Sequence, residues 1–267
     1  MNAFFTAKEY LQWLINSKAR HGIHSPFLYQ FLDQCLYRES EKSLFEIPEK
    51  HRRNLKNDHT ILEYIDLGAG KRNQRNNNSN KKIKRIEVRQ IALNSLQQPR
   101  YCRLFYRMIK YFDCRNVLEM GTSFGVTTSY MSLAGAHVII DSIEGAYPIA
   151  ELAGNYFSEN KFTNIILHRG NFDFILEDVI SGKSYDLVFM DGNHRGSRTL
   201  EYFQKLIKHI NPEGVVIIDD IRWSESMLNA WKEIKNHNDV TLSIDLFRMG
   251  IVFFDIRLKK QEFAIRF

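Results

Sequence analysis

Short, mostly apolar runs alternate with helix-like stretches through the second half of the chain. Runs of this kind are typical of strands that are buried on both faces of a sheet. When such strands alternate with helices, they indicate a parallel sheet covered by helices on both faces. The runs lie at 117–120, 137–143, 164–168, 185–190 and 215–219, and the expected helices lie near 125–134, 146–160, 172–181, 196–210 and 225–237.

The pattern changes at the end of the chain. Two further strands are expected at 240–246 and 251–255, and the few residues around Gly250 between them favour an antiparallel hairpin. Residues 263–267 can add an edge strand. We therefore predict an α/β fold for residues 99–267, with a Rossmann-like, mostly parallel sheet of seven strands that ends in an antiparallel hairpin.

Residues 1–98 have a mainly helical pattern and are expected to form an N-terminal extension. Ser25-Pro26 is a typical helix start, because serine caps the free N–H groups and proline fits the first turn. A short strand is expected at 63–67, and a helix is expected to resume near Ile83. A further helix is expected over 100–112, where apolar residues recur at helical spacing.

The positive charge of the chain is concentrated in one segment. The formal net charge is +6, and residues 71–89 carry eight Lys or Arg residues against one acid, so the remainder is close to neutral. The Asn- and Lys-rich stretch at 71–85 lacks apolar periodicity, which predicts a basic, flexible loop. Such a loop is usually a solvated segment, but it also leaves RNA or another polyanion open as a partner.

Composition indicates an ordinary globular protein, with 44% hydrophobic and 25% charged residues. No run approaches the roughly 18 apolar residues of a membrane-spanning helix. Lys8 and Glu9 interrupt the N-terminal stretch before the apolar core of a signal peptide forms. Cys35, Cys102 and Cys114 are odd in number and suit neither a disulfide framework nor a zinc site, so we expect reduced thiols in a cytoplasmic protein.

The sharpest motif is Glu119-Met-Gly121-Thr-Ser-Phe-Gly125. An apolar strand ends in an acid, and a glycine-containing turn leads into a helix, which places the motif where open α/β sheets bind ligands. A dinucleotide fingerprint would present its helix N-terminus to an anionic pyrophosphate. A carboxylate would repel phosphate but suits a cation. S-adenosylmethionine (SAM), with its ammonium and sulfonium, fits better than a dinucleotide.

Two later strand ends extend this expected cofactor site. Glu144 ends the next strand, where an acid can accept hydrogen bonds from both ribose hydroxyls, and Gly145 permits a close turn after it. Asn171 and Phe172 follow the third strand, where an amide and an aromatic ring suit adenine. Phe172 fits a core position equally well.

Acidic residues also follow the fourth and fifth strands. Asp191, Asp219 and Asp220 are expected at the rim of the site and could together hold Mg²⁺, which prefers oxygen ligands and would acidify a substrate hydroxyl. In the alternative interpretation, Asp191 contacts cofactor or substrate while Asp219 and Asp220 cap the next helix. His194 is a candidate general base, although a single loop histidine is more often structural.

These segments resemble the class I SAM-dependent methyltransferases, and most closely the catechol and caffeoyl-CoA O-methyltransferase branch. The resemblance covers about residues 100–255. It implies that Asp191 and Asp219 bind metal and that Ser123 and Thr127 line the methionine. The candidate catalytic residues are Asp191 and, from its own chemistry, His194. The residues expected to bind the cofactor are Glu119, Gly121, Thr122, Ser123, Gly125, Thr127, Glu144, Gly145, Asn171, Phe172 and Asp191.

The chain departs from that branch at two points. Asp219-Asp220 stands where the branch has Asp-Asn, and the branch's catalytic lysine has no match; Arg195 is nearby but is a poor base. Residues 20–27 and 219–224 also resemble uncharacterised bacterial methyltransferase-like proteins. We expect His21 and His24 to lie near the pocket in a helical lid; the alternative is a helix-start turn in which both histidines have structural partners. Residues 66–70 imitate a second SAM motif, but a polar loop follows where a helix is needed.

The sequence therefore predicts a SAM-dependent methyltransferase that O-methylates a small molecule, with Mg²⁺ as a further candidate cofactor. The alternatives are an RNA methyltransferase that uses the basic loop, a non-catalytic SAM-binding protein, and a related α/β enzyme with other chemistry. A homodimer is compatible with the sequence.

Overall fold

The computed structural model describes residues 3–19, 25–65 and 83–267. The basic run up to residue 82, the motif-like stretch 66–70, and His21 and His24 lie outside the described residues. The chain forms two compact units, each built from several segments. The first unit comprises Met1–Glu39, Tyr111–Leu118 and Ile180–Phe267, and the second comprises Ser40–Lys110 and Glu119–Val179.

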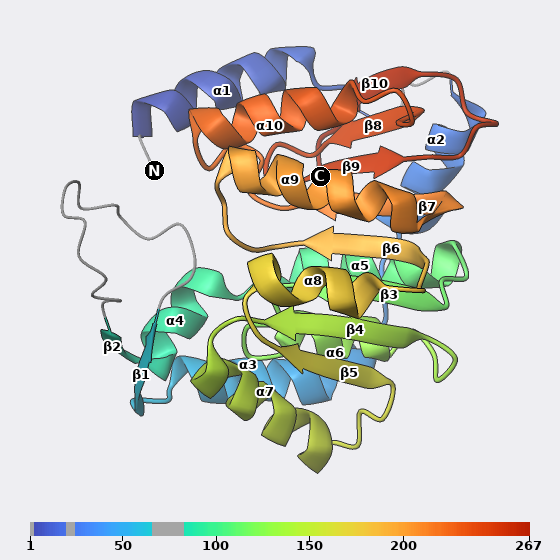
Figure 1. Cartoon of the computed structure of the whole chain (residues 1–267). Coiled ribbons are helices and arrows are strands. Elements are labelled where there is room, and N and C mark those ends of the chain that lie inside the picture. The colour runs from blue at the N-terminus through green and yellow to red at the C-terminus, as the bar shows by residue number, and fades with distance from the viewer. Residues whose placement is uncertain (1–2, 20–24, 66–82) are drawn as a thin grey trace. The chain divides into compact units, whose positions relative to one another are not determined.

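The main sheet has eight strands in the order β10-β8-β9-β7-β6-β3-β4-β5 (Figure 1). This confirms the predicted α/β sheet but corrects its count of seven strands, because β10 (Gln261–Ala264) pairs with β8 and completes the edge. β3 (Asn116–Met120) contributes residues to both units. The predicted site residues Glu119, Glu144 and Asp191 lie at or directly after the carboxyl ends of strands, which is where open α/β sheets bind ligands.

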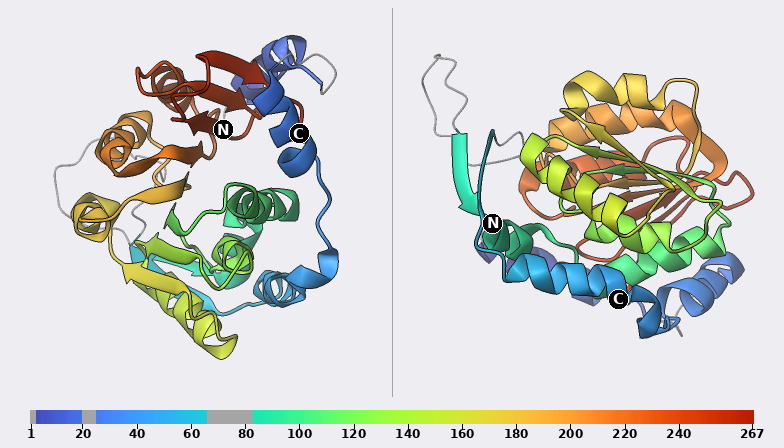
Figure 2. Two further views of the ribbon diagram at one scale, coloured as in Figure 1. Left: turned by 90° about the vertical axis from the view of Figure 1, so that its right-hand side faces the viewer. Right: turned by 90° about the horizontal axis from the view of Figure 1, so that it is seen from below.

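In the first unit, parallel strands are closed by the expected antiparallel hairpin. β9 pairs antiparallel with both β7 and β8, whereas β6 and β7 are parallel. Helices α9 and α10 pack against each other (Figure 2). The elements are α1 (Ala3–Asn16), α2 (Pro26–Phe31) with a π-helical continuation (Leu32–Leu36), β6 (Tyr185–Met190), α9 (Gly196–Leu206), a 3₁₀ turn (Ile207–His209), β7 (Ile210–Ile218), α10 (Glu225–Lys235), β8 (Leu242–Asp245) and β9 (Gly250–Phe253).

The second unit contains α3 (Glu46–Lys56), which packs against α4 and α6 (Figure 2). Its strands β4 and β5 are parallel. The remaining elements are a 3₁₀ turn (Lys42–Phe45), β1 (Ile61–Ile65), β2 (Ile83–Glu87), α4 (Val88–Ser95), α5 (Pro99–Tyr111), α6 (Val126–Ser132), β4 (Ile139–Glu144), α7 (Tyr147–Glu159), β5 (Ile165–Arg169) and α8 (Phe172–Ile180).

The helix expected to resume near Ile83 begins only at Val88, which corrects the prediction. Residues Ile83–Glu87 instead form strand β2, which pairs antiparallel with β1 in a separate two-stranded sheet. The expected strand at 63–67 corresponds to β1. Arg85 of β2 forms an ion pair with Glu63 of β1 at 2.8 Å, so part of the local basic charge is neutralised across the two strands.

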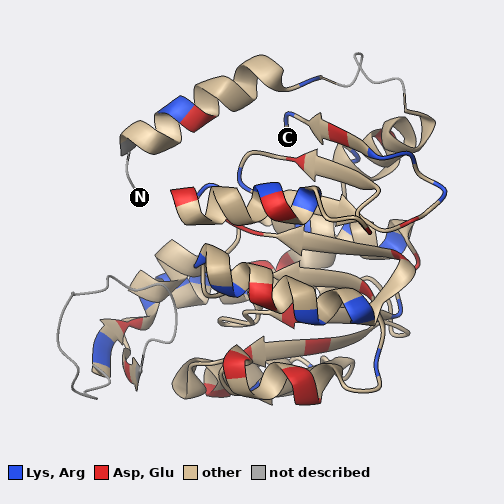
Figure 3. Ribbon diagram, turned by 45° about the horizontal axis from the view of Figure 1, so that its top comes forward, with Lys and Arg blue, Asp and Glu red and all other residues tan. Residues whose placement is uncertain are grey.

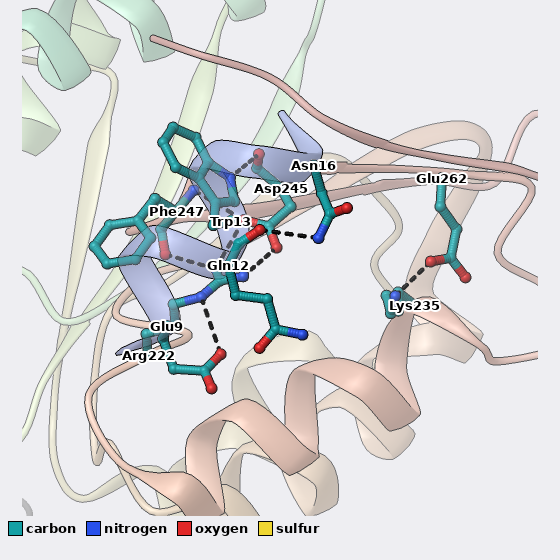
Figure 4. Close-up of polar contacts among 9 residues, drawn as sticks. All are labelled: Glu9, Gln12, Trp13, Asn16, Arg222, Lys235, Asp245, Phe247 and Glu262. Atoms are coloured by element: carbon teal, nitrogen blue, oxygen red, sulfur yellow. Dashed lines mark hydrogen bonds and ion pairs between the residues drawn. The ribbon is translucent and has the colours of Figure 1, made fainter. Parts of the chain in front are cut away.

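Helix α1 is held against the C-terminal hairpin by one tryptophan and one arginine (Figure 4). The Trp13 indole N–H donates to the Asp245 carbonyl at 3.1 Å, and its ring contacts the Phe247 ring. The Arg222 guanidinium donates to both Asp245 carboxylate oxygens at 2.8 and 2.7 Å and lies 3.9 Å from Glu9 of α1. A planar guanidinium paired with a carboxylate in this way fixes orientation as well as distance.

Charged residues of both signs are interspersed along α10 (Figure 3), as on an ordinary solvated helix face. In the part of the chain that the structure describes, no helix is long and apolar enough to cross a membrane.

Trp13→Ala should lower the free energy of unfolding by about 3 kcal/mol, because it removes a buried ring and its hydrogen bond. The matched control is Ile15→Ala on the same helix, where the side chain is 83% exposed and little should change. Urea unfolding of both variants measures the difference. Equal stabilities would contradict the described docking of α1.

Candidate functional site

The loop between β3 and α6 is the tightest turn near the predicted site. Gly121, Ser123 and Gly125 have φ angles of 111°, 48° and 78°, in the left-handed region that favours glycine. A Cβ atom on Gly125 would lie 2.5 Å from the ring of Phe157. The Gly121 N–H donates to the carbonyl of Ile143 on β4 at 2.9 Å. These contacts therefore hold the backbone of the Gly121–Gly125 loop close to the end of β4.

Glu119 ends β3 with a completely buried carboxylate. Its Oε2 accepts hydrogen bonds from the hydroxyls of Thr128 and Ser142, each at 2.5 Å. Its Oε1 is buried and has no hydrogen-bond partner among the described residues. Burial, reinforced by the charge of Glu144, raises the pKa of Glu119 to about 7. An oxygen that can still accept a hydrogen bond makes Glu119 suited to a ligand donor, above all a cationic one.

Glu144 ends β4 and joins it to the same loop. Its Oε2 accepts from the Ser123 N–H and its Oε1 from the Ala146 N–H, both at 2.8 Å. Burial raises the pKa of Glu144, although these backbone hydrogen bonds oppose the shift. Each carboxylate oxygen can accept a second hydrogen bond. The side chain is thus fixed in orientation while it keeps the capacity to bind two hydroxyls, and Gly145 follows it as expected.

The smaller predicted side chains divide into loop and core positions. Thr122 is buried, with its hydroxyl 2.6 Å from that of Ser142. The Ser123 hydroxyl lies 3.2 Å from that of Ser95 on α4. Thr127 is buried beside the Cys102 thiol at 3.8 Å, so its contact with a ligand stays a prediction.

The residues after β5 belong to the start of α8. The side-chain oxygen of Asn171 accepts the Asp173 N–H at 3.0 Å, which ties this side chain to the first turn of the helix. Phe172 is half-buried at the first position of α8. Contact of either residue with adenine also stays a prediction.

Sequence reasoning missed His51 on α3, which contacts the same loop. Its Nε2–H donates to the carbonyl of Phe124 at 2.9 Å, and its ring stacks on Tyr156 of α7 with centroids 3.6 Å apart and an interplanar angle of 4°. Burial lowers the pKa of His51, which favours the neutral ring. The only local signal was a histidine within the strongly charged stretch 38–58, which does not reveal a distant carbonyl partner.

A buried network anchors α3 next to this contact. Arg52 is 4% exposed, and its guanidinium donates to Glu49 at 2.8 Å, to the Gln97 carbonyl at 2.5 Å and to the Cys102 sulfur at 3.4 Å. The Tyr130 hydroxyl of α6 donates to Glu49 at 2.7 Å. Because a buried charge is costly unless it is paired, this network fixes α3 against α5 and α6.

The second group of predicted residues lies in the first unit. His194, in the loop after β6, has its Nε2 atom 4.0 Å from Asp191 and 3.8 Å from Asp220. Its ring centroid is 5.5 Å from that of Trp223. Asp220 has a φ of 50°, a strained value for a residue with a side chain. The structure thus brings the candidate base together with two of the three predicted carboxylates.

The third carboxylate, Asp219, is 1% exposed and faces an arginine that sequence reasoning also missed. Arg248, from the turn between β8 and β9, lies 3.4 Å from Asp219 and 3.3 Å from Asp220. The alternative helix-capping role of these two aspartates is wrong, because the Ser224 side chain caps α10 by accepting the Met227 N–H.

The predicted metal ligands do not fit a metal centre. Among the residues that the structure describes, no group of three or more His, Cys, Asp or Glu side chains could hold a metal ion. The carboxylates of Asp219 and Asp220 instead share a guanidinium. No step of the chemistry is therefore assigned to Mg²⁺.

Glu119→Gln should change how stability depends on pH. The pKa of Glu119 is raised from 4.5 to about 7 in the fold. The folded chain therefore holds this proton more tightly, and stability falls as pH rises between these values. Glutamine cannot ionise, so at about pH 8 the variant should be more stable than wild type, by up to about 3 kcal/mol. The two proteins should differ less at about pH 5.

Urea unfolding at both pH values measures this effect. The control is Glu151→Gln at an exposed site on α7, which should keep the wild-type pH dependence. An unchanged pH dependence in Glu119→Gln would show that Glu119 ionises normally.

Residues 118–221 match the model of a family described as a methyltransferase domain. No curated protein matches the chain. An O-methyltransferase from Bacillus cereus, solved with S-adenosylhomocysteine (SAH), is 14% identical with a TM-score of 0.54, over 85% of this chain and 97% of that chain. TomG from Streptomyces achromogenes, solved with SAM, is 18% identical with a TM-score of 0.53, over 61% and 82%.

A putative caffeoyl-CoA O-methyltransferase from Staphylococcus aureus is 16% identical with a TM-score of 0.53, over 60% of this chain and 85% of that chain. At these identities the likeness establishes the fold, whereas the family match rests on sequence. Residues 118–221 are therefore similar in sequence to a methyltransferase domain, and the fold of the chain is the one seen in these solved O-methyltransferases.

Proposed function

We propose that the chain binds SAM and transfers its methyl group to a hydroxyl oxygen of a small molecule. The observation that carries the proposal is the pair Glu119 and Glu144 beside the loop Gly121–Gly125, within the stretch that matches the methyltransferase family. SAM supplies a methyl group on a positively charged sulfur. A buried carboxylate with an unpartnered oxygen suits a cationic ligand and disfavours a phosphate.

Each residue of the proposed SAM site in the second unit has a distinct proposed role. Glu144 accepts the two ribose hydroxyls, because its carboxylate is already oriented by backbone N–H groups. Glu119 supplies a carboxylate at the end of β3, just before the loop Gly121–Gly125. Gly121 lets the backbone of this loop approach SAM closely. Asn171 and Phe172 are the proposed adenine contacts. His51 is a positioning residue, because it holds the Phe124 carbonyl of the loop.

The acceptor side of the chemistry is assigned to His194. In an in-line displacement the acceptor oxygen forms a bond to the methyl carbon while the carbon–sulfur bond breaks, and the hydroxyl proton must go to a base. The His194 imidazole accepts that proton. The carboxylates of Asp191 and Asp220, at 4.0 and 3.8 Å, stabilise the imidazolium that forms. Asp191 therefore acts on the base in this proposal, and its expected contact with the cofactor is a separate prediction.

Calorimetric titration of SAM and SAH into the wild-type chain tests the proposal. We expect micromolar binding, and Glu144→Ala should weaken it about tenfold or more, the value of one or two hydrogen bonds to a charged group. Glu151→Ala, which removes an exposed acid from α7, is the matched control and should bind as wild type does. Absence of binding to the wild type would overturn the proposal.

His194→Ala should separate chemistry from cofactor binding. With an acceptor identified by screening phenols, catechols and other hydroxylated molecules with labelled SAM, kcat should fall about 10²–10⁴-fold. The calorimetric Kd for SAM should stay within about twofold. His237→Ala, a second partly exposed histidine of the first unit, is the control. Unchanged turnover in His194→Ala would exclude it as the base.

A further inference from the structure

The turn that carries Arg248 is fixed to the segment after β7. The Leu246 N–H donates to the Met249 carbonyl at 2.8 Å and closes the turn between β8 and β9. The Ile221 N–H donates to the Arg248 carbonyl at 3.0 Å. The backbone of Arg248 is therefore hydrogen-bonded to Ile221, the residue directly after Asp220. This backbone contact places the Arg248 side chain close to Asp219 and Asp220.

The Arg248 guanidinium faces the Asp219 carboxylate with its Nε and one terminal nitrogen. Nε and Nη2 lie 3.4 Å from Oδ1 and Oδ2 of Asp219, and Nε lies 3.3 Å from Oδ1 of Asp220. Asp219 is 1% exposed, so its charge needs a partner within the fold. Although burial would lower the pKa of Arg248, the two carboxylates outweigh this effect and raise it. Arg248 is thus a permanent cation.

The contacts leave an unfavourable geometry for a divalent ion. Mg²⁺ binds carboxylate oxygens at about 2.0–2.1 Å in an octahedral shell. Both oxygens of Asp219 already face N–H groups of Arg248, and Oδ2 of Asp220 faces His194 at 3.8 Å. A metal ion at these oxygens would therefore have to displace the guanidinium of Arg248.

We propose that Arg248 takes the electrostatic place of the divalent metal ion at Asp219 and Asp220, so that this site works without a metal. The inference rests on the proposed function for the identity of the reaction. Asp219 and Asp220 both face the one guanidinium, so the opposite charge that the two carboxylates need comes from within the protein. The second aspartate, Asp220, therefore has a reason to replace the asparagine of the metal-dependent branch.

Electron paramagnetic resonance of Mn²⁺ tests this directly on the full chain, without an acceptor. Mn²⁺ gives a six-line signal that is lost on binding. Wild type should leave the signal of millimolar Mn²⁺ unchanged, whereas Arg248→Met, which uncovers the carboxylates, should bind Mn²⁺ at least about tenfold more tightly. Arg257→Met removes another arginine paired with an aspartate, Asp255, and should behave as wild type does.

Two results would overturn the proposal. One is stoichiometric binding of Mn²⁺ by the wild-type chain that the Asp219→Asn substitution abolishes. This result can be obtained even if the Arg248 variant does not fold. The other is a folded Arg248→Met variant, verified by circular dichroism, that gains no affinity for Mn²⁺. Calorimetry of SAM in the same wild-type sample with EDTA separates the two proposals. Absence of SAM binding both with and without EDTA would count against the proposed function and leave the Mn²⁺ result to decide the role of Arg248, whereas SAM binding that is lost only in EDTA would count against a site that works without a metal.

Discussion

Burial of a carboxylate costs free energy unless hydrogen bonds or an opposite charge compensate it, and Glu119 and Asp219 are both buried at strand ends. The chain compensates them differently. Glu119 receives two hydroxyl hydrogen bonds and keeps one oxygen unpartnered among the described residues, and burial outweighs these hydrogen bonds and raises its pKa. Asp219 faces a guanidinium. The carboxylate of Glu119 is therefore suited to a cationic ligand, whereas the charge of Asp219 is already compensated by Arg248.

The N-terminal segments take part in both units. Helix α1 contacts the C-terminal hairpin through Trp13 in the first unit, and α3 contacts the β3–α6 loop through His51 in the second. Each contact combines a hydrogen bond to a backbone carbonyl with a ring contact, tilted between Trp13 and Phe247 and stacked between His51 and Tyr156, which fixes orientation more strictly than apolar packing alone. The predicted division at residues 98 and 99 stays a prediction, but residues before it are integral to the packing of each unit.

The alternating pattern predicted the positions of the strands that end at Glu119 and Glu144, because buried strands in parallel sheets leave a local apolar signature. Partners that are distant in the sequence leave no such signature. Arg248 is 29 residues from Asp219, and His51 is 73 residues from Phe124, so neither contact could be read from spacing. Strand β2 was mistaken for a helix because only five residues, in an exposed and charged segment, form it. The eighth strand, β10, is an edge strand with weak apolar alternation.

The central claim is that Glu119, Glu144 and the loop between them form the binding site for SAM. A crystal structure of the chain with SAH tests it most directly, because it locates the ligand. We expect both ribose hydroxyls within hydrogen-bond distance of the Glu144 carboxylate and the ligand against the backbone of Gly121. A nucleoside bound elsewhere, with Glu144 contacting only the N–H groups of Ser123 and Ala146, would contradict it.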